Sequence, residues 1–248
     1  FKRTAAMISV ENISKSFGEV TAVDNVSLQA PDGKITALLG ANGAGKTTSM
    51  RMIYALIKPE GGQVLVDGIN THEDPVAARA RMGVLPDARG LYKRLTAREN
   101  IVYFGRLQGM KEAKIKERCE ELVDRLGMGA FIDRKTEGFS QGQRVKVAIA
   151  RALIHDPQNS LLDEPTNGLE VTSTRAILRF LKEQRALGKC ILFSSHVMQE
   201  VSAVCDEITI IDGGQIVASG TESQLRDKTG SENLEDAFVS LVGGEKVV

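Results

Sequence analysis

The hydrophobic and polar positions of the first third of the chain predict short strands followed by one helix. Between Met7 and Gly33, apolar residues form short alternating segments separated by turn residues, which is typical of a strand-and-turn region. Residues 34–39, KITALL, predict a short buried strand that leads into glycines. We expect a helix from about Lys46 to Ile57 and, after a glycine pair, another strand from Val64 to Val66.

The middle of the chain is predicted to be mainly helical. Thr96 and Glu99 have the spacing of a capping box, in which each side chain accepts a hydrogen bond from a backbone amide in the first turn of a helix. That helix is expected to end near Gly109, and a charged amphipathic helix follows from about Lys111 to Leu126. Because strands are expected on both sides, we interpret residues 88–138 as a helical insertion in an α/β domain.

The second half of the chain alternates between strands and helices. The expected elements are, in order, a helix that begins after Ser140 and runs to Ile154, a strand at 161–162, a helix at 174–187 and a strand at 190–193. Strand, helix and strand in succession indicate a parallel sheet with crossover connections. Near the end, two short apolar segments flank Asp212-Gly213-Gly214, which predicts a hairpin.

Composition narrows the class of protein. The 248 residues are 42% hydrophobic and 26% charged, which is typical of a globular domain and excludes disordered and fibrous proteins. The 32 basic and 32 acidic residues cancel, so no overall field attracts nucleic acid or an anionic membrane surface. No apolar run approaches the roughly 18 residues that a membrane span needs, so we expect any membrane work to be done by a partner.

The cysteines and the first residues favour a cytoplasmic protein. The 3 cysteines lack C-x-x-C spacing, which predicts reduced thiols rather than a zinc site or a disulfide framework. Residues 1–6 carry Lys2 and Arg3 but no apolar stretch behind them, so they do not form a secretion signal. We expect these six residues to be a short tail or a remnant of cloning.

Residues 40–47, GANGAGKT, fit the pattern G-x-x-x-x-G-K-[ST], with a predicted strand before them and a predicted helix after them. The glycines let backbone amides close around phosphate oxygens, and the helix start adds a partial positive charge. Lys46 is expected to reach the outer phosphates, and Thr47 to ligate Mg²⁺. The alternative is a chance glycine turn. The predicted nucleotide site contains Gly40, Asn42, Gly43, Ala44, Gly45, Lys46, Thr47 and Thr48.

Two adjacent carboxylates follow the strand at 161–162. Successive side chains of a strand point to opposite faces, so one carboxylate cannot do both jobs of a nucleotide-hydrolysing site. We expect Asp163 on the metal side and Glu164 to activate water as a general base. His196 follows the strand at 190–193 and is expected at the same sheet edge. Alone it would be interpreted as a structural histidine, but the other motifs favour a contact with the γ-phosphate.

Residues 138–147, GFSQGQRVKV, predict a turn and then an exposed helix start, with Ser140 at the cap and Gln143 three residues later. A helix start of this kind can bind an anion, which would give the chain a second phosphate-binding element. An ordinary capped helix remains the alternative for Ser140 and Gln143 taken alone.

Taken together, these motifs resemble the nucleotide-binding subunit of ABC transporters over essentially the whole chain from Met7. Residues 139–143, FSQGQ, stand where that family has its signature, usually LSGGQ. The resemblance implies the ABC ATPase fold, an α/β fold with a P-loop NTPase core around a parallel sheet, an N-terminal antiparallel β subdomain and an inserted α-helical subdomain. It also implies that Ser140, Gly142 and Gln143 contact ATP held by a second copy, in a head-to-tail pair that encloses two ATP molecules.

The resemblance also implies how the single domain over residues 7–248 is organised. We expect residues 7–87 and 139–220 to form the core with its antiparallel β subdomain, residues 88–138 the helical subdomain, and residues 221–248 a C-terminal helical tail.

Three more positions carry over from the family pattern. Phe17 stands where an aromatic residue stacks on adenine, although an isolated phenylalanine is more often part of the core. Asp87 stands at the Q-loop, where relatives usually have Gln or Glu touching Mg²⁺ and the attacking water. Its shorter side chain favours a bridging water over direct metal contact. Glu170 stands at the D-loop, where aspartate is usual, and its extra length is expected to alter communication between the two subunits.

Residues 87–92, DARGLY, and 234–238, LEDAF, resemble exporter-type subunits that include sodium-extrusion and drug-resistance ATPases. For the second stretch, a surface amphipathic helix is the alternative. The expected function is therefore ATP hydrolysis that drives export at the cytoplasmic face of the cell membrane, through separate permease subunits that residues 91–93 contact, with ATP and Mg²⁺ as cofactors and no nucleic acid. The transported substrate and the direction of transport do not follow from this chain.

Two alternative functions stay open. One is a soluble ABC-type ATPase acting on ribosomes or DNA. Such proteins usually carry two ATPase units or long coiled-coil insertions, and the single unit and balanced charge here disfavour it. The other is a regulatory ATP-binding module with little turnover. Intact Glu164 and His196 disfavour that module, whereas Asp87 and Glu170 favour it.

Overall fold

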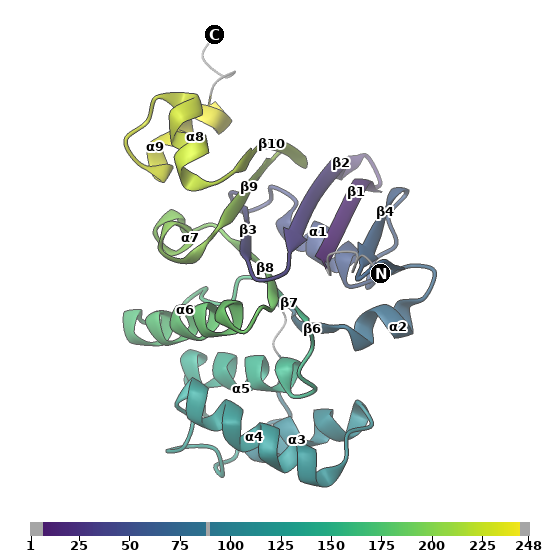
Figure 1. Cartoon of the computed structure of the whole chain (residues 1–248), viewed down its shortest axis with the longest axis vertical. Coiled ribbons are helices and arrows are strands. Elements are labelled where there is room, and N and C mark those ends of the chain that lie inside the picture. Colours follow the sequence, from purple (N-terminus) through teal and green to yellow (C-terminus); the bar gives the residue numbers. More distant parts are fainter. Residues whose placement is uncertain (1–6, 88–89, 244–248) are drawn as a thin grey trace.

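The computed structural model describes residues 7–87 and 90–243, in which two sheets meet above a layer of helices (Figure 1). The short tail expected at residues 1–6 lies outside the described residues. So do Ala88 and Arg89 of the exporter-like stretch and the last five residues of the expected C-terminal tail.

The first sheet is antiparallel and contains the N-terminal strands. Its order is β2-β1-β4-β5, with β1 at Met7–Phe17, β2 at Val20–Pro31, β4 at Gly61–Val66 and β5 at Ile69–Asn70. The prediction of separate short segments before Gly33 was wrong, because β1 and β2 are long and continuous. Asn12 and Asn25, which look like breaks in the sequence, adopt positive φ angles of 53° and 51° where the pairing register shifts.

The second sheet contains the predicted parallel strands. Its order is β10-β9-β3-β8-β7-β6, with β3 at Ile35–Leu39, β6 at Met82–Leu85, β7 at Asn159–Leu162, β8 at Cys190–Ser195, β9 at Glu207–Asp212 and β10 at Gln215–Gly220. The pairs β3/β8, β3/β9, β7/β8 and β6/β7 are parallel, which confirms the prediction of a parallel sheet. The pair β9/β10 is antiparallel, which confirms the predicted hairpin.

Both faces of the parallel sheet are covered. All five residues of β3 are buried, as expected for a strand with an unbroken apolar sequence. Leu38 packs in a core shared with the antiparallel sheet and α1 (Lys46–Ile53). Ala37 and Leu39 pack in a second core on the opposite side, with α5 (Gln141–Leu153), α6 (Val171–Ala186) and α7 (Met198–Val204). The alternation along β3 therefore ties two hydrophobic cores to one strand.

Several element boundaries differ from the prediction. Helix α1 ends at Ile53 rather than near Ile57, and Ala55 has a positive φ of 58° that the helix cannot continue through. Helix α6 begins at Val171, three residues before the predicted start. The pattern also missed α2 (Pro75–Ala80), which is short, begins with a proline and is capped by Asp74.

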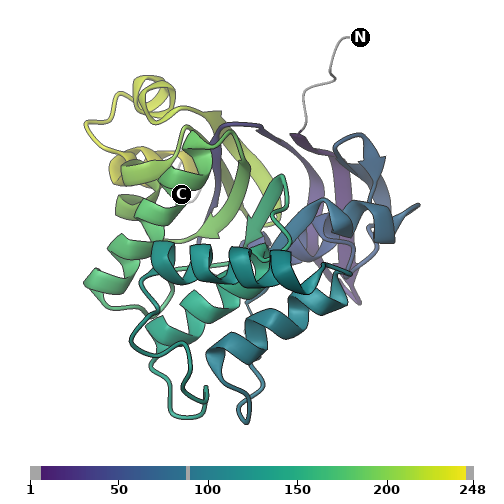
Figure 2. The same ribbon diagram turned by 60° about the horizontal axis from the view of Figure 1, so that its bottom comes forward.

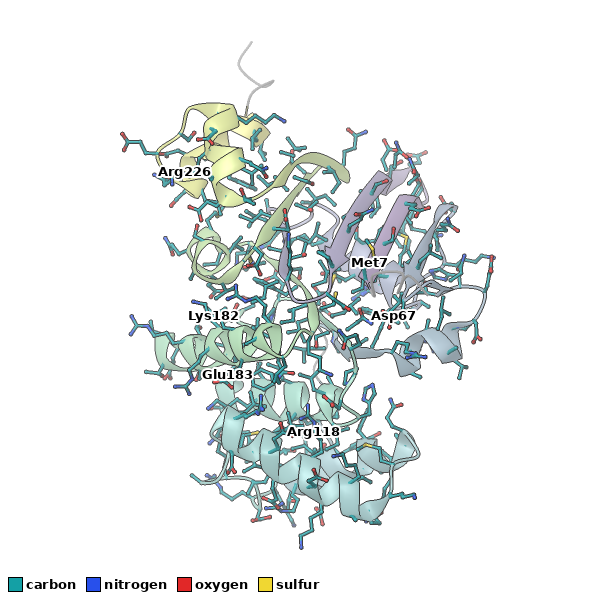
Figure 3. All side chains as sticks on the ribbon, in the orientation of Figure 1. Met7, Asp67, Arg118, Lys182, Glu183 and Arg226 are labelled. Atoms are coloured by element: carbon teal, nitrogen blue, oxygen red, sulfur yellow. The ribbon has the colours of Figure 1, made fainter. Side chains whose placement is uncertain are left out.

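The predicted helices of the middle region are present as α3 (Ala97–Leu107) and α4 (Glu112–Leu126), and the Thr96–Glu99 capping box is confirmed. Figure 2 shows these helices beside α5, which both of them contact. The buried guanidinium of Arg118 on α4 lies 2.9 Å from Asp156 Oδ1 (Figure 3). That ion pair ties the helical region to the turn before β7.

The chain ends in α8 (Glu222–Thr229) and α9 (Leu234–Gly243), which pack on each other, and α9 also contacts α7. Leu234, Ala237 and Phe238 are buried in this contact. The exporter-like stretch LEDAF is thus the first turn of α9, with one face buried and with Glu235 and Asp236 exposed, which fits the alternative of a surface amphipathic helix. Within the described ranges, no helix combines the length and the apolar composition that crossing a membrane requires.

Candidate functional site

A pocket of about 600 Å³ opens at the sheet edge where β3 and β7 end. Five parts of the chain form its walls. They are β2 with Ala22; the glycine loop and α1 with Asn42, Gly43 and residues 45–48; the residue after β6, Asp87; α5 with Gln141, Arg144 and Val145; and the turn after β7 with Glu164 and Asn167. The structure therefore brings together the glycine motif, the acidic residue after β7 and the residue predicted at the Q-loop.

The glycine loop needs glycine for packing as well as for phosphate binding. A Cβ on Gly40 would lie 2.3 Å from Ile211 O, and one on Gly45 would lie 2.6 Å from Ala22 O. Gly45 also has a φ of 104°, which other residues rarely adopt. At Gly43 a Cβ would meet no atom within 4 Å, and glycine is favoured there by the φ of 84° instead. Both end glycines therefore let the loop pack against β2 and β9, a reason that the motif alone did not reveal.

Lys46 lies at the floor of the pocket and is only 5% exposed. Its Nζ donates to Gly40 O at 2.8 Å and to Ala41 O at 3.0 Å, and it lies 3.2 Å from Glu164 Oε1. These contacts hold the ammonium group at the mouth of the loop. A phosphate bound there would meet a charge that is already positioned, so little side-chain entropy remains to be lost on binding.

Asp163 points into the protein and is fully buried. The Ser194 hydroxyl donates to its Oδ1, and burial raises the pKa of the carboxyl, an effect that the Ser194 and Thr47 hydroxyls partly oppose. Within the described residues, Oδ2 is buried without a hydrogen-bond partner. A buried carboxylate oxygen next to a threonine hydroxyl is a donor set that fits Mg²⁺, which prefers oxygen ligands.

Glu164 turns the opposite way and joins the pocket wall. Its Oε2 lies 2.7 Å from His196 Nδ1, its Oε1 faces Lys46, and its amide donates to Ser194 Oγ at 2.9 Å. The residue has a positive φ of 48°, a strained backbone that the surrounding hydrogen bonds maintain. Because β7 ends at Leu162 and Glu164 has left-handed backbone, the different environments of the two side chains arise from the bend after the strand rather than from strand alternation.

Two predicted residues lie at the margin. Asp87 is half-exposed on the pocket wall, with Arg51 Nη2 3.5 Å from its Oδ1. Phe17 is 51% exposed and is not among the described residues that line the pocket. Its ring lies 5.7 Å from Lys15 Nζ. The alternative of Phe17 as a core residue is therefore wrong.

The second predicted anion-binding element has the expected local geometry. Gln143 N donates to Ser140 Oγ at 3.3 Å, and Ser140 N donates to Gln143 Oε1 at 3.0 Å, which confirms a capping box at the start of α5. Ser140 is exposed and does not line the pocket, although Gln141 and Arg144 do. At Gly142, a Cβ would lie 2.6 Å from Ser173 Oγ, so glycine lets α5 pack on α6.

The sequence pattern did not predict some residues that the structure places at the site. Ser194 contacts both Asp163 and Glu164, and Asn167 O accepts a hydrogen bond from Gln141 Nε2 at 3.1 Å. The polar pair Ser194-Ser195 at the end of an apolar strand was a signal for the first. Glu170, expected at the D-loop, is the N-cap of α6 and makes no side-chain capping bond.

The site has a glycine loop between a buried strand and a helix, and a buried aspartate and a pocket-facing glutamate follow a neighbouring strand. These features define a P-loop nucleotide-binding protein. The ABC transporter family model matches residues 23–167. The chain is 45% identical to the ABC transporter ATP-binding protein NatA of Bacillus subtilis (strain 168), over 96% of this chain and 99% of NatA. It is 34% identical to the linearmycin resistance ATP-binding protein LnrL of the same organism, over 94% of this chain and 75% of LnrL.

Solved structures agree with this relationship. The ATP-binding subunit of an ABC transporter superposes with a TM-score of 0.87 and 28% identity, over 95% of this chain and 99% of that one. The ATP-binding cassette MJ0796, solved as a dimer in a post-hydrolysis state with ADP and Pi, gives a TM-score of 0.79 and 27% identity, over 87% of this chain and 98% of that one. The chain therefore belongs to the ABC transporter family, as one of its ATP-binding, ATP-hydrolysing domains, and the expected ABC ATPase fold is confirmed.

Proposed function

We propose that this chain energises export of a substrate through separate transmembrane subunits, as a pair of copies that bind two ATP molecules between them. The observation that carries the proposal is the contact chain from Lys46 through Glu164 to His196 at the mouth of the glycine loop. This contact chain supports a site in which a cation, a carboxylate and an imidazole act on the outer phosphate of a nucleotide bound by the loop.

Each residue of this chain has a proposed task in hydrolysis. The amides of residues 40–48 and the Lys46 ammonium bind the phosphates, and Phe17 stacks on the adenine. Glu164 accepts the proton of the attacking water as general base, and His196 contacts the γ-phosphate while it holds the Glu164 carboxylate. Thr47 and Asp163 would hold Mg²⁺, with Asp87 reaching it through water. When bound, the metal would neutralise charge on the phosphates.

The second copy completes each site in this proposal. Ser140, Gly142 and Gln143 lie at an exposed helix start outside the pocket of their own chain, which supports a role toward the nucleotide of a neighbour. The dimeric state named for MJ0796 supports the same arrangement.

An exposed apolar patch supports docking to a membrane subunit at the cytoplasmic face. Tyr92 and Tyr103 are 50% and 40% exposed, with their rings edge to face at 5.5 Å, and Leu107 farther along α3 is 61% exposed. Tyr92 lies five residues after the pocket residue Asp87 in the chain, which supports a link between a partner on this patch and the nucleotide site. The name of LnrL as a resistance protein supports export as the direction.

Replacement of Glu164 by glutamine tests the assignment of the general base. We expect turnover to fall by about 10² to 10⁴-fold because the amide cannot accept the proton, while ATP affinity is retained. Steady-state ATPase assays with ATP-binding measurements check this, and Glu117→Gln, which changes an exposed glutamate on α4, serves as a matched control. Normal hydrolysis by the Glu164→Gln protein would reject both the assigned role and the mechanism built on it.

A pull-down from native membranes tests the proposed partner. Tagged wild-type protein is expected to recover a polytopic membrane protein, and a Tyr92→Asp, Leu107→Asp protein to recover much less of it. Recovery of ribosomes or DNA in its place would favour a soluble ABC-type ATPase.

A further inference from the structure

Thr166 and Glu200 join the two segments that carry the proposed catalytic pair. The Thr166 hydroxyl donates a short hydrogen bond to Glu200 Oε2. Thr166 lies two residues after Glu164 and is 6% exposed, and Glu200 lies on α7, four residues after His196. The bond therefore bridges the turn after β7 and the helix after β8, alongside the direct contact between Glu164 and His196.

Glu200 is close enough to both members of the pair to interact with their charges. Burial raises the pKa of its carboxyl, the hydrogen bond from Thr166 and the charge of His196 lower it, and the charge of Glu164 raises it. Glu200 contacts the turn that carries Glu164 through the Thr166 hydroxyl, which donates a hydrogen bond to the Glu200 carboxylate.

The turn at residues 164–169, which Glu200 contacts through Thr166, also contacts the start of α5. Asn167 N donates to Glu164 O at 3.2 Å, and Leu169 N donates to Thr166 O at 3.1 Å, so residues 164–169 form a compact turn. Gln141 Nε2 then donates to Asn167 O at 3.1 Å. Because Gln141 follows the cap residue Ser140, a shift of this turn would change the position of the start of α5.

We propose that Glu200 is a positioning residue for ATP hydrolysis: by holding Thr166, it fixes the turn after Glu164 relative to His196 and to the start of α5. This assignment rests on the proposed roles of Glu164 and His196. Glu200 affects turnover by fixing the position of Glu164 relative to His196, without contact with the nucleotide.

Four variants test this: Glu200→Ala, Thr166→Val, the double variant, and Thr166→Ser, which keeps the hydroxyl. We expect each of the first two to lower kcat by about 10-fold, the loss typical for a hydrogen bond to a charged group, with ATP affinity within about twofold of wild type. The double variant is expected to lose no more than the worse single variant, because both break one bond. Thr166→Ser is expected to retain most of the wild-type kcat.

Separate outcomes identify which claim fails. Multiplying losses in the double variant, unchanged kcat in Glu200→Ala, or a Thr166→Ser protein as slow as Thr166→Val would overturn the positioning role. Gln199→Ala, an exposed change on the same helix, controls for damage to α7 and is expected to behave as wild type. Glu164→Gln, assayed in parallel, tests the proposed function itself. If it is inactive while Glu200→Ala is normal, only the positioning claim falls.

Discussion

Asp163 and Glu164 are neighbours in the chain, yet their carboxylates have different environments. Asp163 is fully buried against Ser194, whereas Glu164 reaches Lys46 and His196 at the pocket. The sequence predicts that the two carboxylates have different tasks, but not through strand alternation, because β7 ends at Leu162 before both of them. The positive φ of Glu164 and the double contact of Ser194 could not be predicted, because they depend on a strand about thirty residues away in the chain that only the fold brings adjacent.

His155 provides a prediction about acid stability. Its Nε2 lies 3.1 Å from Met82 O, its Nδ1 is buried without a hydrogen-bond partner in the described part of the chain, and burial lowers its pKa. The folded-state pKa thus lies below the unfolded value of about 6.5. The stability that the neutral ring contributes is present above that value and is lost as the pH falls through it.

We therefore expect the free energy of unfolding of the wild type to fall between about pH 7.5 and pH 5.5, and to fall less in a His155→Gln protein, whose amide can still donate to Met82 O. Urea unfolding at a series of pH values measures this. His72, whose pKa burial also lowers, offers the matched variant His72→Gln. Equal pH slopes in the wild type and His155→Gln would contradict the account.

The starts of α3 and α5 could be predicted because their capping boxes are local. Ser or Thr followed three residues later by Glu or Gln fixes the start of a helix without tertiary information. Strand β6 could not be predicted, since its four residues include Gly83, which looks like a turn residue. A Cβ there would lie 2.6 Å from Ala152 O, so the glycine is required by the close packing of α5 on the strand.

Two caps of the same design allow stability and function to be separated. Thr96→Ala and Ser140→Ala each remove one capping bond and are expected to cost about 1 kcal/mol, or a Tm decrease of about 2–4 °C. Only Ser140→Ala is expected to lower ATPase turnover as well, because the Ser140 hydroxyl is assigned to the γ-phosphate of a second copy. Thermal melts and ATPase assays below the Tm check this. Equal turnover in the two variants would count against that assignment.

At the scale of the whole molecule, the parallel sheet explains why motifs far apart in the sequence meet. The ends of β3 and β7 carry the glycine loop and Glu164 to one pocket, with Asp163 buried beside it, and the residues after β8 bring His196 to Glu164. The order of motifs predicts this edge. It does not predict that Gln141 and Arg144 line the pocket, because their placement depends on how the helical region packs on the core.

In the proposed dimer, each ATP is bound by the glycine loop of one copy and the capped helix of the other. Lys46→Ala and Ser140→Arg proteins test it most directly, since each alone should be inactive. When the two are mixed, one of the two sites in a mixed pair contains an intact loop and an intact helix start. We expect ATPase activity to reappear on mixing and to scale with the fraction of mixed pairs. Mixtures that stay inactive, with mixed pairs verified by differently tagged chains, would contradict it.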